Sequence, residues 1–332
     1  MPPIINCRRS RLRPPRHPRR SRRRPPPIVS PRSLNFLLNP VRRVLFFAAA
    51  AGAASFAAAQ SAPARPAPKF LGSQPDQTEG AKILAGFRNV GIQGDYWLKF
   101  DLRVMPRKGD ERRLEGEMFG AQGPDGPLTK LLVDDLGNKG GSHLQLYLLK
   151  GGRNQEAWEW NHGQRGITPS RVEDDGLLAS VQGTDLTLFD LQMPFLHWTD
   201  FIYEGVANVR GRPAHAFLLY PPTPLEIPAN ENGTPPAAVR VFLDTQFSAM
   251  TQAEWLDAAG KPLKTITVLD LKKTGEQWIV KSIDLRNHRT RAKTRFALTA
   301  AALGLSLPPE TFDPQRISHP NPPVPADKVE RF

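Results

Sequence analysis

Most of the chain after residue 94 alternates between apolar and polar residues with a period of two. In "DYWLKFDLRV", residues 95–104, Tyr96, Leu98 and Phe100 share an apolar face. Asp95, Lys99 and Asp101 point the other way, which is typical of an antiparallel strand with one solvated face. Trp97 is an exception on the polar face. Further strands are predicted at 112–121, 128–134, 143–150, 155–161, 200–209, 213–220, 238–244, 250–257, 263–271, 277–286 and 289–298. Turn signals such as "GPDG" and "AAGKP" join many of them, which predicts a meander.

Only two segments have the spacing of helices that could cover the apolar face. Thr78 can cap a helix over 78–88. Residues 185–201 predict one or two short helices interrupted at Pro194. A wide sheet with such small covers tends to curl into a partial barrel, whose interior is either a filled core or a ligand cavity.

The last predicted strand, "RTRAKTRFAL", separates its basic residues from its other residues most clearly. Thr290, Ala292, Thr294, Phe296 and Leu298 share one face, and the other face carries Arg289, Arg291, Lys293 and Arg295. Two interpretations stay open: a docking stripe for an acidic partner or lipid headgroups, or a solvated face that protects the sheet edge.

The net charge of +13 is confined to the first residues of the chain. Thirteen arginines lie at or before Arg43, and the first acidic residue is Asp76. The remaining 32 basic residues balance 32 acidic ones, so nucleic-acid binding is not expected despite the Arg-rich start.

An apolar run from Val44 to about Ala59 follows Arg42 and Arg43. This order predicts a signal peptide at 41–59, cut between Ala59 and Gln60, and hence a periplasmic protein. An uncleaved anchor and a buried Ala-rich helix are the alternatives. Residues 1–40, predicted to be disordered, are either a real basic arm or an over-extended start.

The domain limits follow from composition. Residues 60–77 predict a Pro-rich linker, 78–315 the folded domain, and 316–332 a disordered tail. The sole cysteine, Cys7, precedes the predicted cleavage site, so no disulfide is expected in the mature chain, which is expected to be a monomer.

Motifs of enzymes and of metal sites are missing from the sequence. It contains no G-x-S-x-G, H-E-x-x-H or G-x-x-x-x-G-K-[ST] pattern. The histidines have no metal-ligand spacing, and the acidic clusters at 134–135 and 173–175 adjoin turn-like sequence. No enzyme activity, cofactor or metal is therefore predicted, although a pair of glycosidase carboxylates stays open.

Aromatic and apolar residues are the only candidates for a binding site. Seven residues could line a cavity, with ordinary core packing as the alternative for each: Tyr96, Leu98, Phe100, Trp158, Trp160, Phe195 and Trp198.

From about residue 183 onward the sequence resembles the periplasmic outer-membrane lipoprotein-sorting protein superfamily (LolA-like). The stretches that carry this resemblance are "GTDLTLFDL" at 183–191, "YEGVANVRGRPAHAFLLYPP" at 203–222, residues 239–298 and "LGLSLPPETFDP" at 303–314. The resemblance implies a mainly β fold, an open half-barrel of about eleven antiparallel strands covered by short helices. The sequence departs from the family pattern in a proline-rich insertion at 221–236.

The function that this resemblance implies is a periplasmic carrier of lipid or lipoprotein acyl chains. Its expected partners include inner- or outer-membrane components of lipoprotein transport. An envelope sensor or scaffold with the same fold, binding a protein partner without catalysis, is the alternative, and a hydrolase is the third.

Overall fold

The chain divides into two compact units, Met1–Ala59 and Gln60–Phe332. The computed structural model describes part of the second unit: residues 65–88, 91–135, 137, 144–152, 154–161, 168–222, 234–247 and 249–332. The predicted signal peptide and the Arg-rich start lie outside the described residues. The second unit contains an extended β-sheet and four hydrophobic clusters, so it has a core of its own.

Fourteen strands of the described residues form one antiparallel sheet. The alternating pattern predicts twelve of them, and the two-residue strands β6 and β14 are additional. The sheet order is β6-β5-β4-β3-β2-β1-β13-β12-β11-β10-β9-β8-β7, and β14 pairs with β13. The strands are β1 (Asp95–Met105), β2 (Arg112–Gly123), β3 (Gly126–Asp134), β4 (Gln145–Lys150), β5 (Glu156–Asn161), β6 (Ser170–Arg171), β7 (Asp200–Val209), β8 (Arg212–Tyr220), β9 (Ala238–Asp244), β10 (Met250–Leu256), β11 (Pro262–Thr274), β12 (Gln277–Asn287), β13 (Lys293–Leu305) and β14 (Glu330–Arg331).

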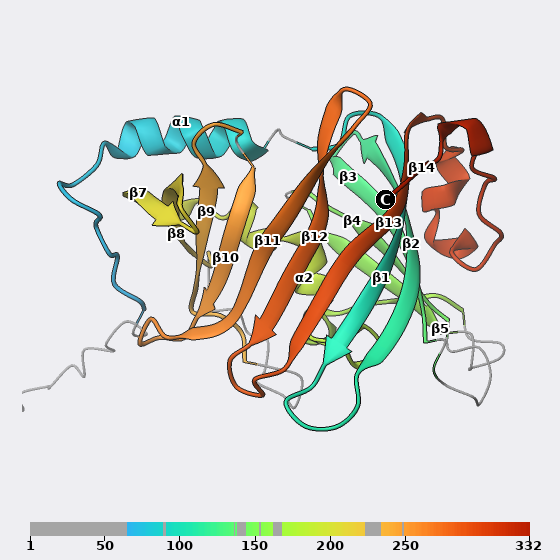
Figure 1. Cartoon of the computed structure of the whole chain (residues 1–332), viewed down its shortest axis with the longest axis horizontal. Coiled ribbons are helices and arrows are strands. Elements are labelled where there is room, and N and C mark those ends of the chain that lie inside the picture. Colours follow the sequence, from blue (N-terminus) through green and yellow to red (C-terminus); the bar gives the residue numbers. More distant parts are fainter. Residues whose placement is uncertain are drawn as a thin grey trace, which may run out of the picture. The chain divides into compact units, whose positions relative to one another are not determined.

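Two meanders meet at the centre of this sheet. Strands β1–β6 form one and β7–β13 the other, and the junction is the long pairing of β1 with β13, in which Phe100 lies opposite Leu298. The sheet is not closed, because β6 and β7 are its two edges. It bends around α2 (Leu188–Gln192), with β11–β13 in front and β3 and β4 behind (Figure 1). The predicted open half-barrel is confirmed.

The inner face of the sheet is covered by α1 (Gln77–Arg88) and by residues 177–198, which we call the covering segment. The covering segment contains α2 and the 3₁₀ turns η2 (Val181–Gly183) and η3 (Pro194–His197), and η1 (Asp174–Gly176) precedes it. The two predicted helical covers are therefore present, and the chain breaks at Pro194 as expected.

The outer face of the sheet is partly covered by the C-terminal residues. Phe312 and Ile317 pack with Leu146 and Leu148 of β4, and Leu307 with Val324 and Val329 packs around Trp97. The sequence predicts a disordered tail at 316–332, but the structure places these residues against the sheet through η5 (Pro314–Arg316), η6 (Ala326–Lys328) and β14, after η4 (Pro309–Phe312). Trp97 provides the reason: an apolar ring on the polar face of β1 needs a cover.

The N-terminal described residues, expected as part of a linker, also contact the sheet. Tyr220 donates a hydrogen bond from its hydroxyl to the Pro66 carbonyl at 2.6 Å. The Lys69 amide donates to the Glu204 carboxylate at 2.6 Å, and the Leu71 amide donates to the Glu204 carbonyl at 3.0 Å. Glu204 is itself held by a two-point ion pair with Arg240, at 2.7 and 3.0 Å.

Candidate ligand-binding interior

The inner face of the sheet is apolar from β4 through β1 and β13 to β8. Leu131, Tyr147, Leu298, Val241 and Phe217 come from five strands of that face, and all are buried in one cluster. From the other side, Leu178, Phe189, Phe195 and Trp198 of the covering segment complete the cluster. Of the two alternatives for the interior, the structure therefore shows the filled one.

Tyr96, Leu98 and Phe100, predicted to line a cavity, lie on this inner face. Tyr96 lies opposite Gly120 and Phe100 lies opposite Gly116 in the pairing of β1 with β2. Both rings occupy the space that a Cβ at these glycines would need. The glycines thus let the two rings lie across β2, where they add to the wall of the interior.

Phe195 and Trp198, predicted to belong to a lid, lie in the covering segment. Their ring centroids are 6.4 Å apart, and each packs on Phe189. Phe189 contacts Trp255 of β10 edge-on, with 4.8 Å between centroids. These aromatic contacts join the covering segment to the wall of the sheet.

Trp158 and Trp160 lie elsewhere. They pack on the other face of the sheet with Leu146, Leu148, Phe312 and Ile317. The reason is the alternation in β5: Ala157, the residue before Trp158, joins the inner cluster, so Trp158 and Trp160 point to the opposite face. The structure thus brings five of the seven predicted residues together and separates these two.

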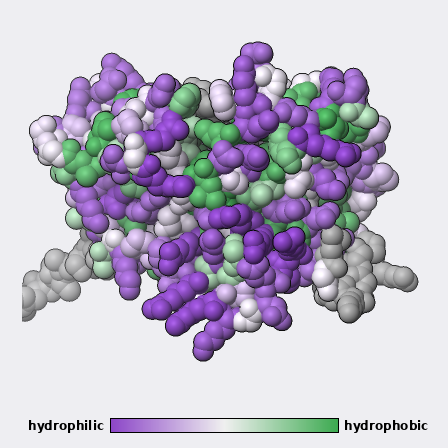
Figure 2. All heavy atoms as spheres, in the orientation of Figure 1, coloured by the Kyte–Doolittle hydropathy of each residue, from purple (hydrophilic) through white to green (hydrophobic). Residues whose placement is uncertain are grey.

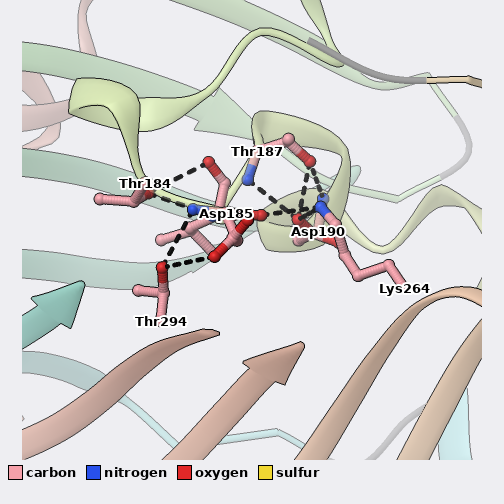
Figure 3. Close-up of polar contacts among 7 residues, drawn as sticks. Thr184, Asp185, Thr187, Asp190, Lys264 and Thr294 are labelled. Carbon is pink, nitrogen blue, oxygen red and sulfur yellow. Dashed lines mark hydrogen bonds and ion pairs between the residues drawn. The ribbon is translucent and has the colours of Figure 1, made fainter. Parts of the chain in front are cut away.

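A buried polar cluster fastens the covering segment to two strands (Figure 3). Thr187 and Asp190 form a capping box at the start of α2, where the Asp190 carboxylate accepts from the Thr187 amide at 2.9 Å. The same oxygen, Oδ2, accepts from Nζ of Lys264 on β11 at 2.7 Å. Lys264 also donates to the Asp185 carbonyl at 2.8 Å, and its ammonium lies 4.2 Å from the Trp255 ring centre.

Asp185 connects this cluster to β13. Its amide donates to the Thr294 hydroxyl at 3.0 Å, and that hydroxyl donates to the Asp185 carboxylate at 3.1 Å. Burial raises the pKa of the Asp185 carboxyl, and the Thr294 hydrogen bond and the nearby Lys264 charge oppose this increase. A charge in an apolar interior is costly unless it is paired, so this cluster is a constraint on where the covering segment lies.

The Asp190–Lys264 ion pair is almost inaccessible to water, with side-chain exposures of 1% and 8%. Asp190 Oδ1 makes no hydrogen bond within the part of the chain that the structure describes. Removing two charges from water costs several kcal/mol per ion, which a single ion pair only partly offsets. The pair is therefore better suited to hold a position than to add much stability.

Sequence reasoning missed this cluster, although two signals were present. Alternation in "KPLKTITV" places Lys264 on the same face as Ile266 and Val268, so its charge must point inward. Thr187 and Asp190 have the spacing of a capping box before an apolar run. Neither signal predicts that Lys264 pairs with Asp190, because these two residues are 74 positions apart in the sequence.

Beside the polar cluster is a cavity of about 40 Å³, lined by Leu178, Thr187, Trp255 and Lys264 among others. Pockets that hold drug-sized ligands measure roughly 300–1,000 Å³. A groove of about 390 Å³ lies at the ends of β7–β12, where Phe247 and Trp278 are exposed. A polar depression of about 950 Å³ adjoins β1 and β2.

The described residues contain neither a metal-binding cluster nor a membrane-spanning helix. No group of three or more His, Cys, Asp or Glu side chains is arranged to hold a metal ion. No described helix has the length and apolar character needed to span a membrane.

Solved structures share this fold. A putative outer membrane lipoprotein-sorting protein domain from Vibrio parahaemolyticus is 14% identical, with a TM-score of 0.60 over 73% of this chain and 97% of that chain. A DUF1329 family protein from Desulfovibrio piger is 15% identical, with a TM-score of 0.59 over 71% and 96%. A LolA superfamily protein from Nitrosomonas europaea is 13% identical, with a TM-score of 0.52 over 70% and 96%.

Comparison of the sequence with known proteins and family models identifies the family. No curated protein matches the chain. A family model described as "-like: Uncharacterized protein" matches residues 146–319, just over half of the chain. The chain therefore belongs to this family of uncharacterized proteins, and its fold is that of the LolA-like superfamily.

Proposed function

We propose that the protein is an exported, periplasmic carrier that binds acyl chains of a lipid or lipoprotein on the inner face of its sheet, without catalysis. The observation that supports this most directly is that a broad apolar face is covered by a segment that is not part of the sheet. The ligand would take the place of the covering segment.

The hydrogen bonds of the covering segment support such a movement. Its backbone–backbone bonds in the described chain stay within residues 174–198, for example Phe189 N to Leu177 O at 3.0 Å and Val181 N to Leu186 O at 2.8 Å. Side chains supply its polar links to neighbouring elements, including those of Lys264 and Thr294, and of Arg88, which donates to the Trp198 carbonyl at 2.7 Å. The segment can therefore leave without breaking the strand ladder.

The backbone of the segment offers two hinge positions. Gln182 and Met193 adopt left-handed conformations, with φ of 51° and 46°, on either side of α2. A left-handed conformation costs a residue with a Cβ about 1–2 kcal/mol, which would be regained on release.

Acyl chains supply enough free energy for the exchange. Burying a methylene contributes about 0.8 kcal/mol, so about eight methylenes contribute roughly 6 kcal/mol before the costs of association. Binding of this kind needs an apolar surface of sufficient area, which is consistent with the absence of a recognisable catalytic motif in the sequence.

The filled interior favours a second candidate, an envelope sensor or scaffold that binds a protein partner on the same fold. In that case the covering segment would be a permanent part of the core. The two candidates differ in one measurable property, uptake of an acyl ligand.

Native mass spectrometry of the Gln60–Phe332 unit, before and after delipidation, tests the carrier proposal. A variant with Asp185→Cys and Thr294→Cys can join the covering segment to β13 by a disulfide, because these two side chains are in contact. We expect the unmodified unit and the reduced variant to take up an offered phospholipid, and the oxidised variant to take up none.

Equal uptake by the oxidised and the reduced variant would show that the ligand binds outside the inner face of the sheet. No acyl species in any form, together with no uptake, would contradict the carrier proposal and favour the sensor.

A further inference from the structure

Basic side chains gather at one end of the sheet, on two neighbouring turns. Residues 103–113, around the β1–β2 turn, contain five basic and two acidic residues, and residues 284–295, around the β12–β13 turn, contain five basic and one acidic residue. The pairing of β1 with β13 sets Arg103 opposite Arg295 and Met105 opposite Lys293. We call residues 103–113 and 284–295 the basic rim.

The basic rim stands out because the rest of the chain after residue 43 is not positive. Basic and acidic residues balance over that part of the sequence, so an excess at one end leaves the remainder negative. In the lower part of Figure 2, the turns at this end of the strands form a strongly hydrophilic surface. Such a charge asymmetry orients a protein as it approaches a charged surface.

Acidic neighbours neutralise only part of the rim. Asp284 accepts from Arg295 at 2.7 and 2.9 Å and lies 3.4 Å from Lys293, and Glu111 pairs with Arg103. Among the described residues, no ion pair reaches Arg107, Lys108, Arg286 or Arg291, all of which are exposed. These four cations extend into solvent from the two turns and the adjoining end of β12.

We propose that the basic rim binds the surface of an anionic phospholipid bilayer. Phosphate headgroups attract clustered Lys and Arg near a membrane surface, and they need no shaped pocket to do so. The observations fit a membrane better than an acidic protein, because specific protein interfaces centre on buried apolar or aromatic anchors.

The rim has no such anchor in the described chain. The exposed large hydrophobic residues lie outside 103–113 and 284–295: Phe70, Leu71, Val206, Phe247 and Trp278. Attachment would thus be electrostatic and peripheral, and it would weaken as salt shortens the range of the charges. This proposal goes beyond the carrier function and does not require that an acyl ligand be bound.

Vesicle co-sedimentation of the Gln60–Phe332 unit tests the proposal. This unit has its own core, and it lacks the arginines before residue 43 that would bind anionic vesicles by themselves. We expect binding to phosphatidylcholine vesicles that contain about one-third phosphatidylglycerol at about 0.1 M salt, and little binding to phosphatidylcholine alone. Arg107→Glu/Arg291→Glu should reduce the binding about tenfold or more.

A control variant with the same change in net charge shows whether position matters. Lys82→Glu/Lys273→Glu changes one residue on α1 and one at the β11–β12 turn, both at the other end of the strands (Figure 1). The control should bind within about twofold of the unmodified unit. Acyl uptake measured in solution should be the same in all three proteins, which separates this proposal from the carrier function.

Two results would overturn the proposal. One is equal loss of binding in both variants, which would mean that net charge alone governs attachment. The other is failure of the unmodified unit to prefer anionic vesicles; if it nevertheless bound polyglutamate through the rim, the partner would be an acidic protein instead.

Discussion

Lys130 shows how a single residue can make stability depend on pH. It lies on β3 under the C-terminal residues, with 2% of its surface exposed, and its Nζ donates to the His319 carbonyl at 3.3 Å. Burial lowers the pKa of its ammonium to about 8 from an ordinary value of 10.5. The unfolded chain therefore keeps this proton at a pH where the folded chain has released it.

The free energy of unfolding should rise as pH increases from about 8 toward 9.5, because the unfolded state binds more protons over this range. Lys130→Met should remove this dependence and raise the free energy of unfolding at about pH 7 by roughly 1–3 kcal/mol. Urea denaturation at both pH values measures the effect, with the exposed Lys82→Met as the control. An unchanged pH dependence in Lys130→Met would assign it to other groups.

The Asp190–Lys264 pair leads to a second prediction for single residues. Lys264→Met leaves the Asp190 carboxylate buried without its cation, which should cost about 3–5 kcal/mol. Asp190→Asn/Lys264→Met should cost clearly less than the sum of the two single changes, because neither member of the pair is then left as a buried charge without its partner. A double-mutant cycle from urea denaturation measures this coupling, and additive costs would show that the two side chains act independently.

At the scale of elements, alternation predicted the strands because one face of each is solvated or lightly covered. The prediction was less exact where a strand does not alternate: β6 and β14 have two residues each and carry no pattern. The pattern predicts a strand from residue 289, but residues 289–292 form the β12–β13 turn, in which Arg291 has a φ of 61°. Contacts such as Lys264 with Asp190 depend on how the chain is folded, which periodicity does not record.

Strand β2 offers a prediction for an element. A methyl group at Gly116 would collide with the Phe100 ring and the Leu132 carbonyl. Gly116→Ala should therefore destabilise the unit by about 2 kcal/mol or more. The matched control is Gly86→Ala in helix α1, where nothing lies near the new methyl group, and it should stabilise the unit by about 0.5–1 kcal/mol.

Thermal unfolding of both variants measures these opposite effects. If the Phe100 ring is the obstacle, Phe100→Leu should cost less free energy in the Gly116→Ala background than in the unmodified unit. Equal costs in the two backgrounds would place the obstacle at the Leu132 carbonyl instead.

At the scale of the whole folded unit, the sheet and its covering segment have different kinds of support. The strands hold one another by a continuous ladder from β6 to β7. The covering segment depends on side-chain contacts with its surroundings, and its own backbone bonds are internal in the described residues. A ligand that competes for the inner face should consequently displace the covering segment and leave the strand ladder unchanged.

Hydrogen exchange with mass spectrometry can observe this separation directly. On addition of a phospholipid to the delipidated unit, amides of residues 177–198 should exchange faster, because displacement exposes them to water, while amides of β1 and β13 should stay protected by their ladder. The oxidised Asp185→Cys/Thr294→Cys variant should show no change at either place. Faster exchange throughout the sheet would mean that lipid unfolds the unit, and no change in the unmodified unit despite bound lipid would place the ligand outside the inner face. Only a change confined to the covering segment fits a sheet that exchanges its own apolar cover for an acyl chain.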